Sequence, residues 1–71
     1  MKYLETLTIV ERTILDLIMD DTTLSDISDK LNMSNNVINS HAGSIISKYG
    51  TITMIGVVKK HIKLNYDHYI N

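Results

Sequence analysis

The stretch TLSDISDKLNMSNNVINSHAGSIISKYG, residues 23–50, decides the fold of this chain. It begins with a helix-capping signal, Thr23 followed by Asp26, after which apolar residues recur at helical spacing. These apolar residues are Leu24, Ile27 and Leu31. The turn Asn32-Met33-Ser34 leads into a second periodic segment, and its one apolar residue, Met33, is expected to point inward. Two helices joined by so short a turn form a helix-turn-helix unit, predicted here at residues 23–49.

The second helix of this unit is expected to have a polar but uncharged outer face. Ser34 is a good N-cap, and Gly50 is a natural stop after Lys48 and Tyr49. The predicted buried stripe comprises Ile38, His41 or Ala42, and Ile45. The residues left outside are Asn35, Asn36, Asn39, Ser40, Gly43, Ser44 and Ser47.

One further helix is predicted on each side of the unit. Thr8 and Glu11 form a capping box, which starts a helix that runs to about Asp20. Its predicted buried stripe consists of Val10, Ile14, Leu17 and Ile18. Residues 51–64 are rich in β-branched side chains, as a strand would be, but their apolar spacing and lysine-rich end favour a helix. That helix is predicted over residues 52–63, capped by Thr53, with a stripe of Met54, Val57 or Val58, and Ile62.

The fold class is therefore all-α, with four helices in a single domain that spans residues 1–71 and has its core in residues 7–65. The tail NYDHYIN is expected to be a docked or frayed end. A chain of 71 residues without cysteine is marginal alone, so helix packing or self-association must stabilise it. No apolar run approaches membrane-spanning length and no secretory signal is present, so the cytoplasm is the expected location.

The sequence contains no recognisable catalytic or metal-binding pattern. No nucleophile–base pair, paired carboxylates or glycine-rich phosphate loop occurs at workable spacing, so we expect neither an enzyme nor a cofactor. His61 and His68 lack metal-ligand spacing with any other candidate ligand. The aspartates lack the glycine and closing glutamate of a calcium loop, which favours a solvated face or caps. The alternative is an acidic patch that repels DNA or contacts a basic partner, formed by Asp16, Asp20, Asp21, Asp26 and Asp29.

The joint spacing of these features resembles the LuxR-type (GerE-like) helix-turn-helix domain of bacterial regulators. Leu7-Thr8 with Glu11 resembles the family's opening L-T-x-R-E, and Ile14-Leu15-x-Leu17 resembles its V-L-x-L. The next two helices resemble S-x-x-E-I-A-x-x-L and S-x₆-H-x₃-I-x₂-K-L-G. The matching residues are Thr23, Asp26, Ile27, Ser28, Leu31, Ser34, His41, Ile45, Lys48 and Gly50, with Tyr49 in place of the leucine. The resemblance covers residues 7–65 without a gap.

The departures from the family pattern fall on its cationic positions. The family's first-helix arginine is Val10 here, and the basic residue two positions before the histidine is Asn39. Gly43 stands where relatives often place a residue that contacts a base or phosphate, and the arginine after K-L-G is Met54. The net charge of −1 is also unusual for a small DNA-binding domain. Positive charge is concentrated at the C-terminal end, in Lys59, Lys60 and Lys63, either as a phosphate-contacting set with Lys48 or as helix-end charges.

The resemblance implies a small transcription regulator that binds double-stranded DNA as a homodimer. Its third helix would enter the major groove and favour an A·T-containing site, since asparagine can pair with adenine. Bases would be faced by Asn35, Asn36, Asn39 and Ser40, with Gly43 allowing close approach. The DNA backbone would be contacted by Ser34, His41 and Lys48, although His41 also fits a purely packing role. The fourth helix would carry the dimer interface, through Ile55, Val58 and Ile62.

A second hypothesis treats the domain as a protein-interaction module. Such a module would bind RNA polymerase or a host regulatory protein and modulate transcription without reading DNA. The uncharged face of the third helix and the acidic N-terminal half motivate it. The many isoleucines and asparagines are consistent with an AT-rich genome, such as that of a phage or a low-GC bacterium.

Overall fold

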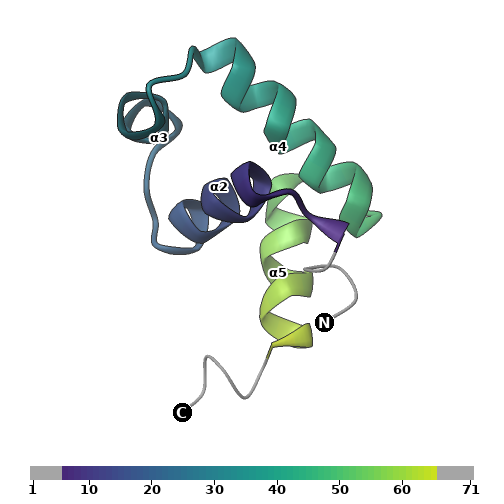
Figure 1. The fold of residues 1–71 in the computed structure, drawn as a ribbon. Helices are drawn as coiled ribbons and strands as arrows, with labels where there is room; N and C mark the ends of the chain where they lie inside the picture. The colour runs from purple at the N-terminus through teal and green to yellow at the C-terminus, as the bar shows by residue number, and fades with distance from the viewer. Residues whose placement is uncertain (1–5, 66–71) are drawn as a thin grey trace.

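The computed structural model describes residues 6–65, which form four α-helices (Figure 1). These are α2 (Ile9–Met19), α3 (Leu24–Leu31), α4 (Asn35–Tyr49) and α5 (Met54–Leu64). The all-α prediction and the four-helix order are confirmed. The predicted tail lies almost wholly outside the described residues.

Local capping explains where each helix begins. The hydroxyls of Thr8, Thr23, Ser34 and Thr53 each accept a hydrogen bond from a backbone N–H in the first turn of the following helix. The predicted capping box is present in full, because the Glu11 carboxylate also accepts from the backbone N–H of Thr8. The fourth helix begins at Met54 rather than at residue 52, since the extended backbone of Thr53 (φ −135°, ψ 165°) ends the preceding loop.

Left-handed residues end the first three helices or the turns that follow them. Asp21, Asn32 and Gly50 have φ values of 58°, 54° and 68°. Asparagine, aspartate and glycine are the residues that adopt this conformation most readily. The chain can therefore reverse direction sharply between helices without proline.

The core lies where α4 meets the other three helices. α4 packs against α2, α3 and α5, so it is the central element of the domain (Figure 1). The side chains that are nearly inaccessible to solvent are Ile14, Leu15, Ile27, Ile38, Ile45, Tyr49 and Val57. Met33 of the turn packs against this cluster, as predicted.

Three of the predicted buried stripes need correction. Leu24 is 47% exposed, because it lies at the first position of α3 opposite small residues of α4 that do not cover it. On α5 the buried residues are Val57 and His61, and Ile62 is 38% exposed. Of the two valines that the pattern left open, Val57 is the buried one, and one turn further along the buried residue is His61 rather than Ile62. On α2 the sequence pattern also missed Leu15, which is fully buried.

A polar pair closes the contact between α4 and α5. The Tyr49 hydroxyl lies 2.7 Å from His61 Nδ1, and the two rings meet edge to face with centroids 6.0 Å apart. Asn65 Nδ2 donates to the His61 carbonyl oxygen at 2.8 Å. Because both Tyr49 and His61 are buried, this hydrogen bond compensates for the loss of water at their polar atoms.

Candidate nucleic-acid interface

The exposed face of α4 is a continuous stripe of small, uncharged residues. Asn36, Ser40, Gly43 and Ser47 recur at i, i+4, i+7 and i+11, so they lie along one line of the helix, and all four are exposed. We term these four residues the open stripe. A Cβ added at Gly43 would have no atom within 4 Å, so the domain itself gives no reason for the missing side chain. Asn35 and Asn39 are also exposed and flank the stripe.

The opposite side of α4 is firmly held. Ser34 Oγ accepts from the Val37 N–H at 3.2 Å and caps the first turn. Ile38, Ile45 and Tyr49 anchor the helix in the core. α4 therefore presents the open stripe on a rigid support, as a recognition helix requires.

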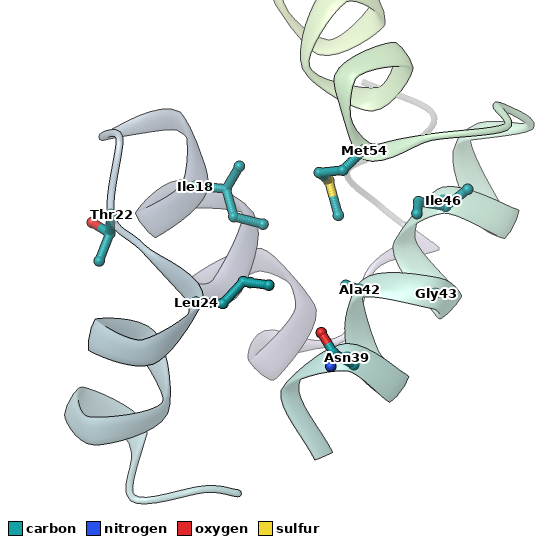
Figure 2. Close-up of a pocket in the computed structure, with 8 residues that line it drawn as sticks. All are labelled: Ile18, Thr22, Leu24, Asn39, Ala42, Gly43, Ile46 and Met54. Atoms are coloured by element: carbon teal, nitrogen blue, oxygen red, sulfur yellow. The ribbon is translucent and has the colours of Figure 1, made fainter. Parts of the chain in front are cut away.

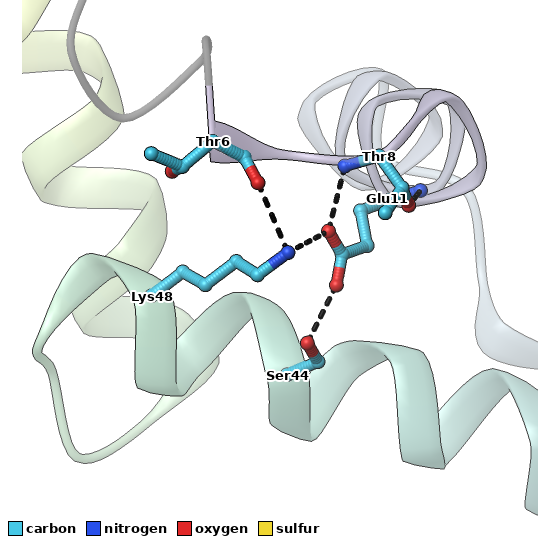
Figure 3. Close-up of polar contacts among 5 residues, drawn as sticks. All are labelled: Thr6, Thr8, Glu11, Ser44 and Lys48. Atoms are coloured by element: carbon cyan, nitrogen blue, oxygen red, sulfur yellow. Dashed lines mark hydrogen bonds and ion pairs between the residues drawn. The ribbon is translucent and has the colours of Figure 1, made fainter.

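Beside the open stripe, α4 is tied to α2 through a buried carboxylate (Figure 3). Lys48 Nζ donates to Glu11 Oε1 at 2.7 Å and to the Thr6 carbonyl oxygen at 3.0 Å. The Ser44 hydroxyl donates to the second oxygen, Glu11 Oε2, at 2.5 Å. Only 4% of the Glu11 side chain is exposed, against 32% for Lys48.

The electrostatics of Glu11 follow from these contacts. Burial by itself raises the pKa of this carboxyl, but the hydrogen bonds from Lys48, Ser44 and the Thr8 N–H, with the charge of Lys48, outweigh it. The net result is a pKa lowered from 4.5 to about 2. Glu11 is therefore ionised at neutral pH and paired with the single lysine of α4.

The site residues predicted from the sequence fall into two groups, those accessible on α4 and those partly engaged within the domain. Asn35, Asn36, Asn39, Ser40 and Gly43 lie on the accessible side of α4. Ser34 uses its hydroxyl as a cap, and Lys48 directs its ammonium group inward. His41 is half-buried, and its imidazole forms no hydrogen bond within residues 6–65.

Sequence reasoning treated Glu11 only as a capping residue and missed the ion pair. One signal was available. Glu11 precedes Ile14 by three residues and Leu15 by four, so it lies on the buried face of α2 and needs a cation.

Charge is separated along the described chain. Five aspartates and no lysine or arginine occur between residues 13 and 29, and all five are exposed. Lys59 and Lys63 are exposed on α5, whereas Lys60 Nζ donates to the Tyr49 carbonyl oxygen at 2.9 Å. The acidic segment runs from α2 into α3, and the basic one occupies the C-terminal half of α5.

α5 also carries apolar residues that the domain leaves uncovered. Ile55 is 68% exposed and Ile62 38%, and Val58 between them is half-buried. Ile52, in the loop just before α5, is 96% exposed. These residues do not belong to the core of residues 6–65.

The described residues contain neither a metal-ligand cluster nor a bilayer-spanning helix. No group of three histidine, cysteine, aspartate or glutamate side chains within residues 6–65 could hold a metal ion. None of the helices α2 to α5 is both long enough and apolar enough to cross a membrane.

The α3–turn–α4 geometry, braced by α2 and α5, defines a helix-turn-helix domain. Residues 5–55 match the sequence profile of the GerE family, described as bacterial regulatory proteins of the luxR family. The chain belongs to this family, whose members are DNA-binding transcription regulators rather than enzymes. Comparison with curated proteins and with solved structures found no match.

Proposed function

We propose that this domain regulates transcription by placing α4 in the major groove of DNA, where it binds weakly and with little help from charge. The observation that carries the proposal is the open stripe, an exposed line of hydrogen-bonding and minimal side chains on the best-supported helix of the fold. Asn36 and Ser40 would meet base edges, with Asn35 and Asn39 beside them. Asparagine bonds adenine through two hydrogen bonds, which favours an A·T-containing site.

Gly43 fits this proposal because it allows the backbone of α4 to lie close to a base pair. A glycine inside a helix costs about 1 kcal/mol relative to alanine, and no neighbour within the described residues requires it. Close approach to DNA would offset that cost.

The DNA backbone would receive few cationic contacts. Lys48 is paired with Glu11, so its contact with a phosphate would compete with a 2.7 Å ion pair. Ser34 and His41 would contribute uncharged contacts at the edges of the helix. Each neutralised phosphate contributes about 0.9 to the slope of log affinity against log salt, so the slope is expected to stay below about 4 in magnitude.

Two copies would bind together through α5. Ile55, Val58 and Ile62 recur at i, i+3 and i+7 and form an apolar line on the uncovered face of this helix. Pairing them across a two-fold axis would bury them and set the separation of two half-sites. Replacing Val58 with Asp should weaken the dimer, measured by sedimentation equilibrium, and a wild type that stays monomeric at high micromolar concentration would refute this interface.

A salt titration with short duplexes tests the DNA proposal. Nucleic-acid-free protein is titrated against an AT-rich duplex and a GC-rich duplex of equal length, at several salt concentrations. Asn39→Ala should lose about 1–3 kcal/mol on the preferred duplex and little on the other. Asn39→Lys should tighten binding to both. No binding of either duplex at low salt would refute the proposal.

A second candidate function is a protein-interaction module that engages RNA polymerase or another regulator without reading DNA. The specific observation in its favour is the inward ion pair of Lys48, which leaves the accessible side of α4 uncharged. Under this alternative the Asn39 substitutions leave DNA affinity unchanged but impair capture of purified RNA polymerase in a pull-down.

A further inference from the structure

A groove separates the α2–α3 junction from α4 (Figure 2). One wall is formed by Ile18 and Leu24, which point across the groove toward α4. The other wall is α4 itself, and Met54 reaches in from the start of α5. The groove measures about 440 Å³, which is enough for a few large apolar side chains.

The groove exists because the side chains of α4 are small at this point. Ala42 and Gly43 supply its wall there and leave space that longer side chains would fill. Ile46 continues the apolar surface, whereas Asn39 and Thr22 are the polar lining residues. The uncovered Leu24, 47% exposed, is thus part of an apolar trough rather than an isolated surface residue.

The wall formed by α2 and α3 belongs to an acidic segment of the chain. Residues 13 to 29 include five exposed aspartates and no lysine or arginine, and Asp20 and Asp21 directly precede the groove-lining Thr22. None of these aspartates forms an ion pair with a residue of 6–65, and no lysine or arginine lines the groove. An apolar groove with one wall supplied by an unneutralised acidic segment favours a cationic, apolar occupant and repels phosphate groups.

We propose that this groove binds a basic amphipathic helix of a partner protein. Apolar residues at i, i+3, i+4 and i+7 of that helix would contact Ile18, Leu24 and Met54, and its lysines or arginines would face the aspartates. A DNA backbone inside the groove is disfavoured by the acidic segment that forms its α2–α3 wall. A second copy of the chain is the competing occupant, since its α5 carries both exposed apolar residues and exposed lysines, and the concentration series below distinguishes it. Asn39 and Gly43 line the groove and also belong to the face of α4 that is proposed to meet DNA, so a partner helix and DNA would compete for them, and the peptide test therefore contains no DNA.

The test uses model peptides and no DNA. The probe is an amphipathic helical peptide of about 18 residues with leucines at the anchor positions and lysines elsewhere. Its matched control replaces every lysine with glutamate. Affinity is measured by fluorescence anisotropy at low micromolar protein, and the site is identified by methionine-methyl NMR, with Met54 as the groove reporter and Met33 as the internal control.

The lysine peptide should bind at least about tenfold more tightly than the glutamate peptide and shift the Met54 methyl signal but not that of Met33. Leu24→Ser removes one wall at an exposed position and should weaken binding about fivefold or more. Ile52→Ser, at an equally apolar but more exposed site outside the groove, should leave the affinity unchanged. Asp20→Asn combined with Asp21→Asn should reduce the preference for the lysine peptide, and asparagine retains the left-handed backbone at residue 21.

Equal binding of the two peptides, an unmoved Met54 methyl, or an unchanged affinity in Leu24→Ser would each overturn the proposal. A Met54 shift that grows with protein concentration in the absence of peptide would assign the groove to a second copy and would also overturn it. A Met54 shift caused by duplex DNA and not by the lysine peptide would assign the groove to nucleic acid, with the same consequence.

Discussion

The Glu11–Lys48 pair makes the stability of this domain depend on pH. Glu11 is buried, and its pKa is lowered from 4.5 to about 2 by hydrogen bonds and by the charge of Lys48. When the pKa of a carboxyl is lower in the folded state, its ionised form stabilises the fold. This stabilisation is complete at pH values above the pKa of the unfolded state. That stability is lost as the pH falls from about 4.5 toward about 2.

The magnitude follows from the size of this change. A lowering from 4.5 to about 2, at about 1.4 kcal/mol per pH unit, corresponds to about 3 kcal/mol of stability at neutral pH. A domain of 71 residues has a total stability of only about 4–10 kcal/mol. The ionised state of the Glu11 carboxyl therefore accounts for a large part of the free energy of unfolding.

The test compares Glu11→Gln with wild type. The free energy of unfolding of each protein is measured by urea denaturation at about pH 7, 5, 4, 3 and 2.5. Wild type should lose stability steadily below pH 5. Glu11→Gln should be less stable at pH 7 and should lose about 3 kcal/mol less than wild type over the same interval. The difference between the two proteins isolates Glu11 from the other carboxyls.

Lys48→Met provides the matched control, because it removes the cation and leaves the buried carboxylate. We expect it to cost about 3–5 kcal/mol at pH 7, more than the double substitution Glu11→Gln with Lys48→Met. Parallel pH profiles for wild type and Glu11→Gln would refute the assignment of the low pKa. A Lys48→Met protein as stable as wild type would refute the ion pair.

Three further substitutions test the packing. Gly43→Ala should raise the free energy of unfolding by about 1 kcal/mol, because a Cβ there meets no atom within 4 Å, and thermal melting would detect the gain. Gly56→Ala should be less stable than Gly43→Ala, since its Cβ would lie 3.0 Å from the Cβ of Thr51, whose position the backbone fixes; equal melting temperatures would contradict this. Tyr49→Phe removes the hydroxyl beside His61 Nδ1 and should cost about 1–3 kcal/mol in urea unfolding, because it leaves a buried nitrogen without that partner.

The helices were predictable because their ends are encoded locally. A threonine or serine immediately before each helix and a glycine after α4 fix boundaries through contacts within a few residues, all of which are visible in the sequence. The family resemblance supported the same four-helix order. Both are confirmed, except that α5 begins two residues later than expected.

The missed features depend on contacts between distant residues. Val57 and Val58 are chemically alike, so periodicity could not determine which of them faces α4, and the buried His61 follows from that choice. The partner of Lys48 lies 37 residues away on α2, and lysine near a helix end is equally typical of a solvent or phosphate contact. The exposure of Leu24 depends on Ala42 and Gly43 across the groove, which no local pattern reveals.

The residues of α4 that are proposed to meet DNA are separate from those that hold the domain together. The side chains of Asn36, Ser40 and Ser47 make no hydrogen bond with any other residue of 6–65, and Gly43 faces empty space. A combinatorial library at these four positions would therefore vary the proposed recognition surface while the caps, the core and the Glu11–Lys48 pair remain unchanged. Most substitutions in a small protein are filtered by the loss of stability that they cause. At these four positions, substitutions are therefore expected to meet little resistance from stability, in evolution or in the laboratory.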